Sequence, residues 1–365
     1  MKISDITGIL EEVAPRALQE GYDNSGLIVG DPDAECDKAL ICLDSTEEII
    51  DEAISQGCGL VIAHHPIVFS GLKKLNGKNY VERVVMKAIK HDIAIYAIHT
   101  NLDNVFHRGV NERIAEKLGL TQTGILAPRS GDLKKLTTFV PETHLDQLRD
   151  AICEAGAGNI GNYDQCTFQV KGIGTFRPLE GSDPYTGERG KRSEEAEVRI
   201  EVIYPLHSES RVLSAMKKAH PYEEVAFYSS DLRNSWQDAG AGMIGELKKA
   251  MSPQDFLKFL KSSMNAEVVR FTPFSRSVKR VAVCGGSGSF LLGQAMAQKA
   301  DAFVTADFKY HQFFDAEGKL MICDIGHYES EQFTTELISD ILSEKIPNFA
   351  LIFAQRGTNP IQYYY

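Results

Sequence analysis

The chain has 365 residues, 43% of them hydrophobic, which is enough for two or three domains with substantial cores. Its net charge of -11 argues against a protein that binds nucleic acid through phosphate contacts, because such a protein needs a basic face. No stretch approaches the roughly 18 uninterrupted apolar residues of a membrane span, and the N-terminus lacks an apolar signal core. The seven cysteines form no C-x-x-C pair and lie mostly in apolar runs, so we expect reduced core thiols and a cytoplasmic protein.

The first part of the chain alternates helical and strand patterns. The predicted elements are a helix at 3–14, strands at 26–30 and 39–43, a helix at 45–56, a strand at 60–63, a helix at 80–91 and a strand at 93–98. Alternation of this kind is typical of an α/β sheet with parallel strands.

The middle of the chain has a different pattern. Strands at 136–140, 165–170 and 197–202 and helices at 144–154 and 208–219 predict the βαββαβ order of a ferredoxin-like domain. The segment 172–197 is rich in Gly, Pro, Ser and charge, and we expect a mobile loop there. The predicted domains are therefore 1–130 and 235–365, two halves of one α/β core, with an inserted domain at 131–234.

The last third repeats the first pattern. Strands are predicted at 281–284 and 302–305, separated by a glycine turn at 285–288 and a helix at 290–299. The glycine turn is a weak candidate for an anion site, since it lacks the lysine of a Walker motif. Aligning 53–56 with 295–298 places Asp307 over His65, which hints at a duplicated unit but is equally compatible with chance.

Three polar motifs follow short apolar runs in the two halves of the core. They are His64-His65-Pro66, His99-Thr100-Asn101-Leu102-Asp103, and His327 with Glu331. Reactive groups of open α/β sheets lie at the carboxyl ends of strands, so we expect a metal site with these residues at strand ends. Each motif alone has a plainer interpretation: a packed and an exposed histidine, a turn, and a solvated i, i+4 pair.

Three imidazoles and two carboxylates without a thiolate suit zinc, manganese, iron or nickel. Five protein ligands exceed the number that one open catalytic ion takes, so two ions about 3.5–4 Å apart fit better, with Glu331 as the bridge. His99 and His311 are candidate proton shuttles, although a structural role is as compatible with the sequence. Asp23 and Asn24 lie in a predicted loop and are candidates for orienting a ligating imidazole, or are simply turn residues.

Five motifs in order carry a resemblance to a known family. They are Gly21 to Leu27 (GYDNSGL), His64-His65-Pro66, His99 to Asp103, Thr305 to His311 (TADFKYH) and Gly326 to Glu331 (GHYESE). The chain resembles the NIF-three-like family, whose members carry the name GTP cyclohydrolase I type 2, in its longer bacterial form with a PII/CutA-like insert. Tyr22 and Ala306 depart from the family pattern, which often has Trp and Gly there, and this bears on pocket shape.

The resemblance implies a dinuclear metal site at His64, His65, Asp103, His327 and Glu331, with the glutamate contacting both ions. It also implies a toroidal homohexamer and a hydrolase that acts on a nucleotide or heterocycle, by opening the guanine imidazole ring of GTP. The alternative is a non-enzymatic metal-binding or regulatory module that acts through the insert. A third reading, single-stranded nucleic acid in the ring, is disfavoured by the net acidity.

Overall fold

The computed structural model describes residues 1–364, which form two compact units. Unit 1 consists of residues 1–127 together with the chain from Asp238 onward, and unit 2 consists of residues 128–237. The chain leaves unit 1 within strand β5 (Thr121–Ser130) and returns within strand β10 (Ser235–Met251). Among the described residues, no helix is both long and apolar enough to cross a bilayer.

The first sheet of unit 1 has the order β1-β4-β3-β2-β15. Its strands are β1 (Gly26–Val29), β2 (Lys38–Cys42), β3 (Leu60–Ala63), β4 (Ala94–Ala97) and β15 (Ala350–Phe353). The strands β4, β3, β2 and β15 are parallel, and β1 is antiparallel to β4. Strands β3 and β4 are buried at every position, as expected for parallel strands covered on both faces.

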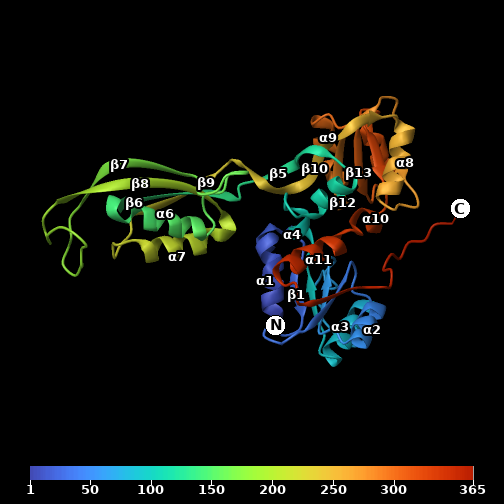
Figure 1. The fold of residues 1–365 in the computed structure, drawn as a ribbon, viewed down its shortest axis with the longest axis horizontal. Coiled ribbons are helices and arrows are strands. Elements are labelled where there is room, and N and C mark those ends of the chain that lie inside the picture. The colour runs from blue at the N-terminus through green and yellow to red at the C-terminus, as the bar shows by residue number, and fades with distance from the viewer. Residues whose placement is uncertain (365) are drawn as a thin grey trace. The chain divides into compact units, whose positions relative to one another are not determined.

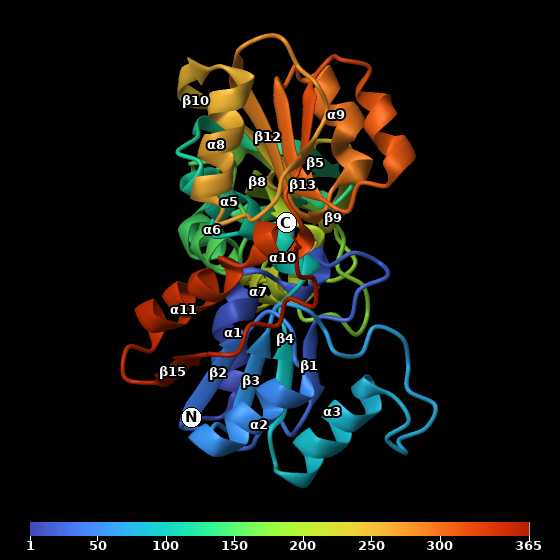
Figure 2. The same cartoon turned by 90° about the vertical axis from the view of Figure 1, so that its right-hand side faces the viewer.

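Helices connect and cover these strands (Figure 2). They are α1 (Ile3–Val13), η1 (Arg16–Leu18), α2 (Glu47–Gln56), α3 (Tyr80–Lys90), α4 (Thr100–Asp103), α5 (Val110–Lys117) and α11 (Thr334–Lys345). Helix α2 begins after Thr46, whose side chain accepts a hydrogen bond from the Ile49 backbone N–H, and ends at the left-handed Gly57. Its buried face packs with α3 against β2, β3 and β4 in one apolar cluster.

The second sheet of unit 1 has the order β11-β14-β13-β12-β10-β5. Besides β5 and β10, its strands are β11 (Arg270–Phe271), β12 (Val278–Ser287), β13 (Ala302–Ala306) and β14 (Met321–Asp324). The associated helices are α8 (Pro253–Ser263), η4 (Ser289–Leu291), α9 (Leu292–Ala297), η5 (Tyr310–Ala316) and α10 (His327–Glu331). Strands β12, β13 and β14 are parallel, whereas β10 and β11 are antiparallel to their neighbours β12 and β14.

Unit 2 is a four-stranded antiparallel sheet with two helices on one face (Figure 1). The sheet order is β7-β8-β6-β9. The elements are β6 (Leu133–Pro141), η2 (Glu142–His144), α6 (Leu145–Glu154), β7 (Thr167–Phe176), β8 (Ser193–Pro205), η3 (Leu206–Ser208), α7 (Glu209–Ala219) and β9 (Phe227–Leu232). Apolar residues of α6 and α7 pack against one face of this sheet, around Leu136, Ile200 and Tyr204.

Two local expectations from the sequence were wrong. The predicted loop at 172–197 is partly strand, because β7 and β8 pair from Thr167↔Val202 out to Phe176↔Ser193. Backbone groups make this ladder whatever the side chains are, so a Gly-rich and charged composition did not prevent it. The predicted turn at 285–288 is likewise largely strand, since β12 continues to Ser287 with an irregular register beside β13.

Candidate metal centre

The candidate ligands follow the carboxyl ends of parallel strands in both sheets of unit 1. His64 and His65 come directly after β3, and Asp103 lies at the end of α4 after β4. His327 and Glu331 lie on α10, which follows β14. The two sheets therefore contribute to one cavity of about 670 Å³.

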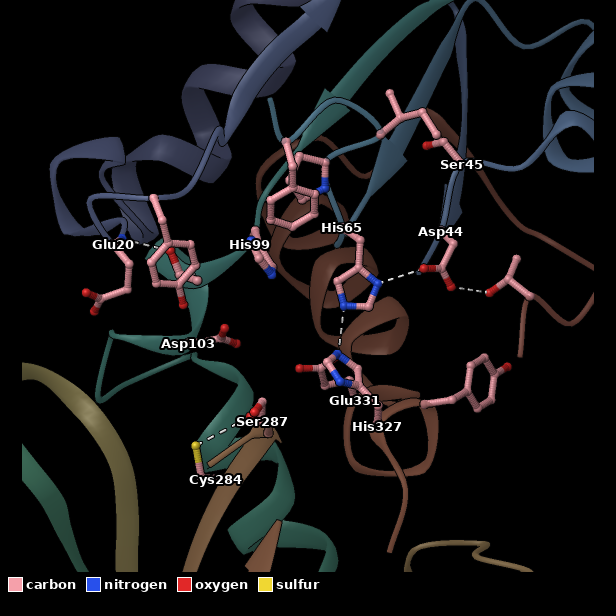
Figure 3. Close-up of a pocket in the computed structure, with 18 of the residues that line it drawn as sticks. Glu20, Asp44, Ser45, His65, His99, Asp103, Cys284, Ser287, His327 and Glu331 are labelled. Carbon is pink, nitrogen blue, oxygen red and sulfur yellow. Dashed lines mark hydrogen bonds and ion pairs between the residues drawn. The ribbon is translucent and has the colours of Figure 1, made fainter. Parts of the chain in front are cut away.

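Glu331 is the residue on which the histidines converge (Figure 3). Its Oε2 lies 2.9 Å from His65 Nε2 and 3.1 Å from His327 Nε2, and its Oε1 lies 3.7 Å from His64 Nε2. The candidate ligand atoms of His64, His65 and Glu331 all lie within 4.8 Å of one another. A carboxylate that presents one oxygen to each side of such a cluster has the form of a bridging ligand.

His64 and Asp103 each have one buried polar atom without a hydrogen-bond partner among the described residues. The Nδ1 of His64 donates to the carbonyl oxygen of Ile98 at 2.8 Å, so this tautomer turns an Nε2 lone pair toward the cavity. This Nε2 is 3.8 Å from Asp103 Oδ1, too far for a hydrogen bond, and both atoms are buried without a hydrogen-bond partner among residues 1–364. Unpaired buried acceptors are costly, and a cation between them would satisfy both. The donor set present here therefore fits a divalent metal ion.

Besides His64, three histidines are each held by a carboxylate at Nδ1, which leaves Nε2 for another partner. The Nδ1 atoms of His65, His99 and His327 lie 2.8, 2.8 and 2.7 Å from carboxylate oxygens of Asp44, Asp23 and Asp307, respectively. A carboxylate on one ring nitrogen fixes the tautomer and orientation of an imidazole, and metal-ligating histidines almost always donate this nitrogen to a carboxylate, a backbone carbonyl or water. The second nitrogens of His65 and His327 are thereby aimed at Glu331.

The electrostatics of the cluster follow from these contacts. Burial opposes the charged form of His65, but hydrogen bonds to Asp44 and Glu331 outweigh it and raise its pKa to about 9. In the same way, Asp307 and Glu331 outweigh burial and raise the pKa of His327 to about 11. Burial and the nearby Glu331 raise the pKa of Asp103 to about 7. The pKa of Glu331 is held well below its usual range, because contacts with the histidines outweigh its burial.

Glycines of β12 make room for the bridging side chain. Gly286 has a φ of +58°, and a Cβ added there would lie 2.4 Å from Glu331 Oε1 and 3.2 Å from His327 Cε1. A Cβ on the neighbouring Gly285 would lie 3.4 Å from Glu331 Cγ. The glycines at 285–288 thus leave space for the Glu331 carboxylate to lie close to the strand. This role differs from the anion site for which the sequence made them a weak candidate.

A segment near the C-terminus reaches the same cavity. Thr358 donates from Oγ1 to Asp44 Oδ2 at 2.7 Å, and Asp44 holds His65 through its other oxygen. Asn359 donates to Glu329 at 3.1 Å, and residues 358–361 line the cavity. The orientation of His65 therefore depends on a residue almost 300 positions downstream of it.

Six of the seven residues singled out in the sequence lie together. His64, His65, Asp103, His327 and Glu331 are adjacent, and the ring of His99 lies 5.3 and 5.5 Å from those of His64 and His65. His311 does not join them: it is exposed on η5, packs beside Tyr310 and Phe314, and does not line the cavity. Asp23 holds His99, which is not one of the five candidate ligands, and Asn24 donates to the backbone carbonyl of Val68, so neither orients a candidate ligand directly as considered from the sequence.

Sequence reasoning missed the orienting roles of Asp44 and Asp307. Asp44 follows β2 and Asp307 follows β13, so each also lies at a strand end. That position was an available signal, but nothing in the spacing joins Asp44 to His65 or Asp307 to His327.

The fold and the site define a class: a two-sheet α/β protein with a histidine and carboxylate cluster shared by both sheets. A family model described as Duf34/NIF3 (NGG1p interacting factor 3) matches residues 1–360. The chain belongs to the Duf34/NIF3 family.

Relatives of this chain are similar along its whole length. A protein of Halalkalibacterium halodurans named GTP cyclohydrolase 1 type 2 homolog is 38% identical over 373 residues, covering 100% of both chains. A Bacillus subtilis protein of the same name is 38% identical over 364 residues, covering 98% of this chain and 97% of its own. The crystal structure of a Bacillus cereus protein related to NIF3 matches with a TM-score of 0.89 at 38% identity, covering 100% of this chain and 99% of that one.

Proposed function

We propose that this protein holds two divalent metal ions on His64, His65, Asp103, His327 and Glu331, and that it is a metal-dependent hydrolase. The observation that carries the proposal is the pair of buried, unpartnered atoms His64 Nε2 and Asp103 Oδ1 beside the Glu331 carboxylate. Zinc, manganese, iron and nickel all suit these ligands. Bound ions would supply Lewis-acid activation of water and of the substrate.

The protein's own residues would orient and protect the reaction. Asp44, Asp23 and Asp307 fix three imidazoles, so little reorganisation is needed when a substrate enters. His99 is held at Nδ1 by Asp23, and its ring lies beside His64 and His65, where it is placed to move a proton at the cavity wall. His311 stays a second candidate for proton transfer, although it is exposed outside this cavity.

The substrate we propose is a nucleotide or related heterocycle. The names of the relatives, GTP cyclohydrolase 1 type 2 homolog, make GTP the first compound to test. Aromatic side chains line the cavity, among them Tyr22, Phe69 and Phe290, and offer flat surfaces for a planar ring. A fold alone does not fix the substrate, so the assay decides this part of the proposal.

The test combines metal content with turnover. Elemental analysis of protein purified without added metal should give about two equivalents per chain, falling sharply in His65→Ala. His107→Ala is the matched control, because His107 is exposed, forms an ion pair with Glu112 and does not line the cavity. Metal-loaded wild type should convert GTP, and Glu331→Gln should not. No metal in the wild type would overturn the metal site, whereas metal without GTP conversion would overturn the substrate.

The alternative function is a non-enzymatic metal-binding or regulatory module that acts through unit 2, which we propose to be an inserted ferredoxin-like domain of the PII/CutA kind. Its supporting observation is a second cavity of about 700 Å³, lined by residues of unit 2. Under this alternative, metal is bound but no hydrolysis is found with any nucleotide. We further propose a cytoplasmic homohexamer, which sedimentation of the intact chain would test.

A further inference from the structure

The open face of the unit 2 sheet carries a groove that is separate from the metal centre. Helices α6 and α7 pack on one face of the sheet, and side chains alternate between the two faces along each strand. On β8, Ile200 and Val202 are buried in the helix-side core, so by alternation Glu197 and Arg199 face the opposite side. The groove there measures about 700 Å³.

Aromatic rings form the walls of this groove. The rings of Phe139 and Tyr228 meet edge to face at 5.9 Å, and those of Tyr185 and Tyr222 meet at 5.8 Å. Tyr228 is 62% exposed and Tyr185 is 51% exposed, although both are large aromatic residues. Ring faces carry negative partial charge, so several rings around one space attract cations.

A carboxylate lies among these rings. Glu197 lines the groove, and the pKa of Tyr222 is raised by burial and by the adjacent Glu197. Gly174 on the neighbouring strand leaves space for this carboxylate, because a Cβ there would lie 2.1 Å from Glu197 Oε2. Within residues 1–364, no lysine, arginine or histidine forms an ion pair with Glu197.

The basic residues of the groove are mostly neutralised by others. Lys171 pairs with Glu142 at 2.5 Å, and Arg199 pairs with Glu201. The two glutamates, Glu142 and Glu201, do not line the groove. Arg177 is exposed where the chain leaves β7. The lining carboxylates Glu197, Glu223 and Glu224 therefore outnumber the single unpaired guanidinium, and the local charge favours a cation.

We propose that this groove binds an organic cation, an alkylated ammonium group held among the tyrosine rings and balanced by Glu197. Aromatic rings around a carboxylate recognise such groups because the cation is poorly hydrated and the ring faces attract it. The volume exceeds that of one ammonium group, so the cation is expected to be part of a larger molecule. This site is independent of the metal centre and of the hydrolase function.

The test measures binding of choline to the full-length, metal-loaded protein by calorimetry and by ligand-detected NMR. The neutral isostere 3,3-dimethylbutan-1-ol has the same shape without the charge, and we expect it to bind at least about tenfold more weakly. Glu197→Gln should weaken choline binding by a similar factor. Glu194→Gln is the matched control: it removes the same charge from the same strand, but Glu194 does not line the groove.

Three results of the choline experiments would overturn the proposal. They are absence of choline binding to the wild type, equal binding of choline and its isostere, and equal weakening in the Glu197 and Glu194 variants. The isostere comparison uses the wild type alone, so it does not depend on the folding of a variant. Binding of inorganic phosphate that is lost in Arg177→Gln would assign the groove to an anion and would also overturn it.

Discussion

The two sheets of unit 1 contain the same sequence of elements but use it differently. In the first, β2, β3 and β4 alternate with α2 and α3 and end in the short helix α4; in the second, β12, β13 and β14 alternate with α9 and η5 and end in α10. Both triplets are parallel, and each is bordered by an antiparallel strand, β1 or β11, beside its last member. The order of elements is thus compatible with the duplication that the alignment of 53–56 with 295–298 suggests.

The difference lies in what each triplet contributes to the cavity. The first supplies His64 and His65, whose side chains are 0% and 18% exposed. The second supplies His327, which is 37% exposed, and the buried Glu331. Where His65 follows β3, Asp307 follows the equivalent strand β13 and orients His327. The same order of elements therefore gives two buried histidines on one side and a more accessible histidine on the other.

The largest effect is expected from Gly286→Ala in the second triplet. The new Cβ would meet Glu331 Oε1 at 2.4 Å, and the positive φ of +58° disfavours any side chain. We expect loss of most bound metal and a free energy of unfolding lower by about 1 kcal/mol or more. Elemental analysis and urea unfolding measure the two effects. Gly293→Ala on α9, where a Cβ meets nothing within 4 Å, should leave the metal content unchanged.

The orienting carboxylates allow the two triplets to be compared directly. Asp44→Asn should lower metal affinity by about 10- to 100-fold, because His65 loses the acceptor that fixes its ring. Asp307→Asn should have a smaller effect, since the Asp307 and His327 pair is more exposed to water than the Asp44 and His65 pair. Competition with a chromophoric chelator would measure both affinities. The reverse order would contradict the argument that the more buried Asp44 and His65 pair matters more.

The charge on His65 predicts a pH dependence of stability in the metal-free protein. Its pKa is about 9 in the folded chain, above the ordinary value of 6.5, so folding favours the protonated ring. This contribution is complete below pH 6.5 and is lost as the pH rises through about 9. Urea unfolding of metal-stripped protein should therefore show stability falling over this range, with a shallower fall in His65→Gln. Equal slopes for the two proteins would contradict the shift.

The smallest effect is expected from Thr358→Val. The hydroxyl donates to Asp44, and removing it should weaken the orientation of His65 without removing any candidate ligand. We expect a loss of a few-fold in metal affinity, about 1 kcal/mol, and little change in the folded structure. The same chelator competition measures it. Thr335→Val serves as the control, because the Thr335 hydroxyl donates to the backbone carbonyl of Gln332 instead of to an orienting carboxylate.

The sequence predicted those parts of the fold that depend on local physics. The strands at 60–63 and 302–305 were predicted because apolar runs between helical patterns have few other solutions, and both are present as β3 and β13. Helix 45–56 is confirmed as α2, which begins two residues later because Thr46 caps it. The outer part of the β7–β8 hairpin was missed, because pairing of backbone groups leaves no hydrophobic signal when both faces are exposed.

At the site, too, local sequence predicted some features, whereas packing between distant elements decided others. Strand-end position indicated the motifs that contain His64, His65, Asp103, His327 and Glu331, and the family resemblance implied their role as ligands. The structure brings these five residues together. The partners of the imidazoles depend on packing between elements far apart in sequence, as with Asp44, Asp307 and Thr358. His311 shares a motif with Asp307, yet a turn into η5 leaves it in solvent. These contacts could not be predicted from the spacing of residues in the sequence.

The entry and exit of unit 2 have a consequence for how this architecture can change. The chain departs in β5 and returns in β10, and these strands are neighbours in the second sheet of unit 1. Removing residues 128–237 would therefore leave the ends of two neighbouring strands of one sheet to be rejoined. Because all five candidate ligands lie in unit 1, such a deletion removes none of them, and the metal content of the shortened chain would measure whether unit 2 is needed for the site.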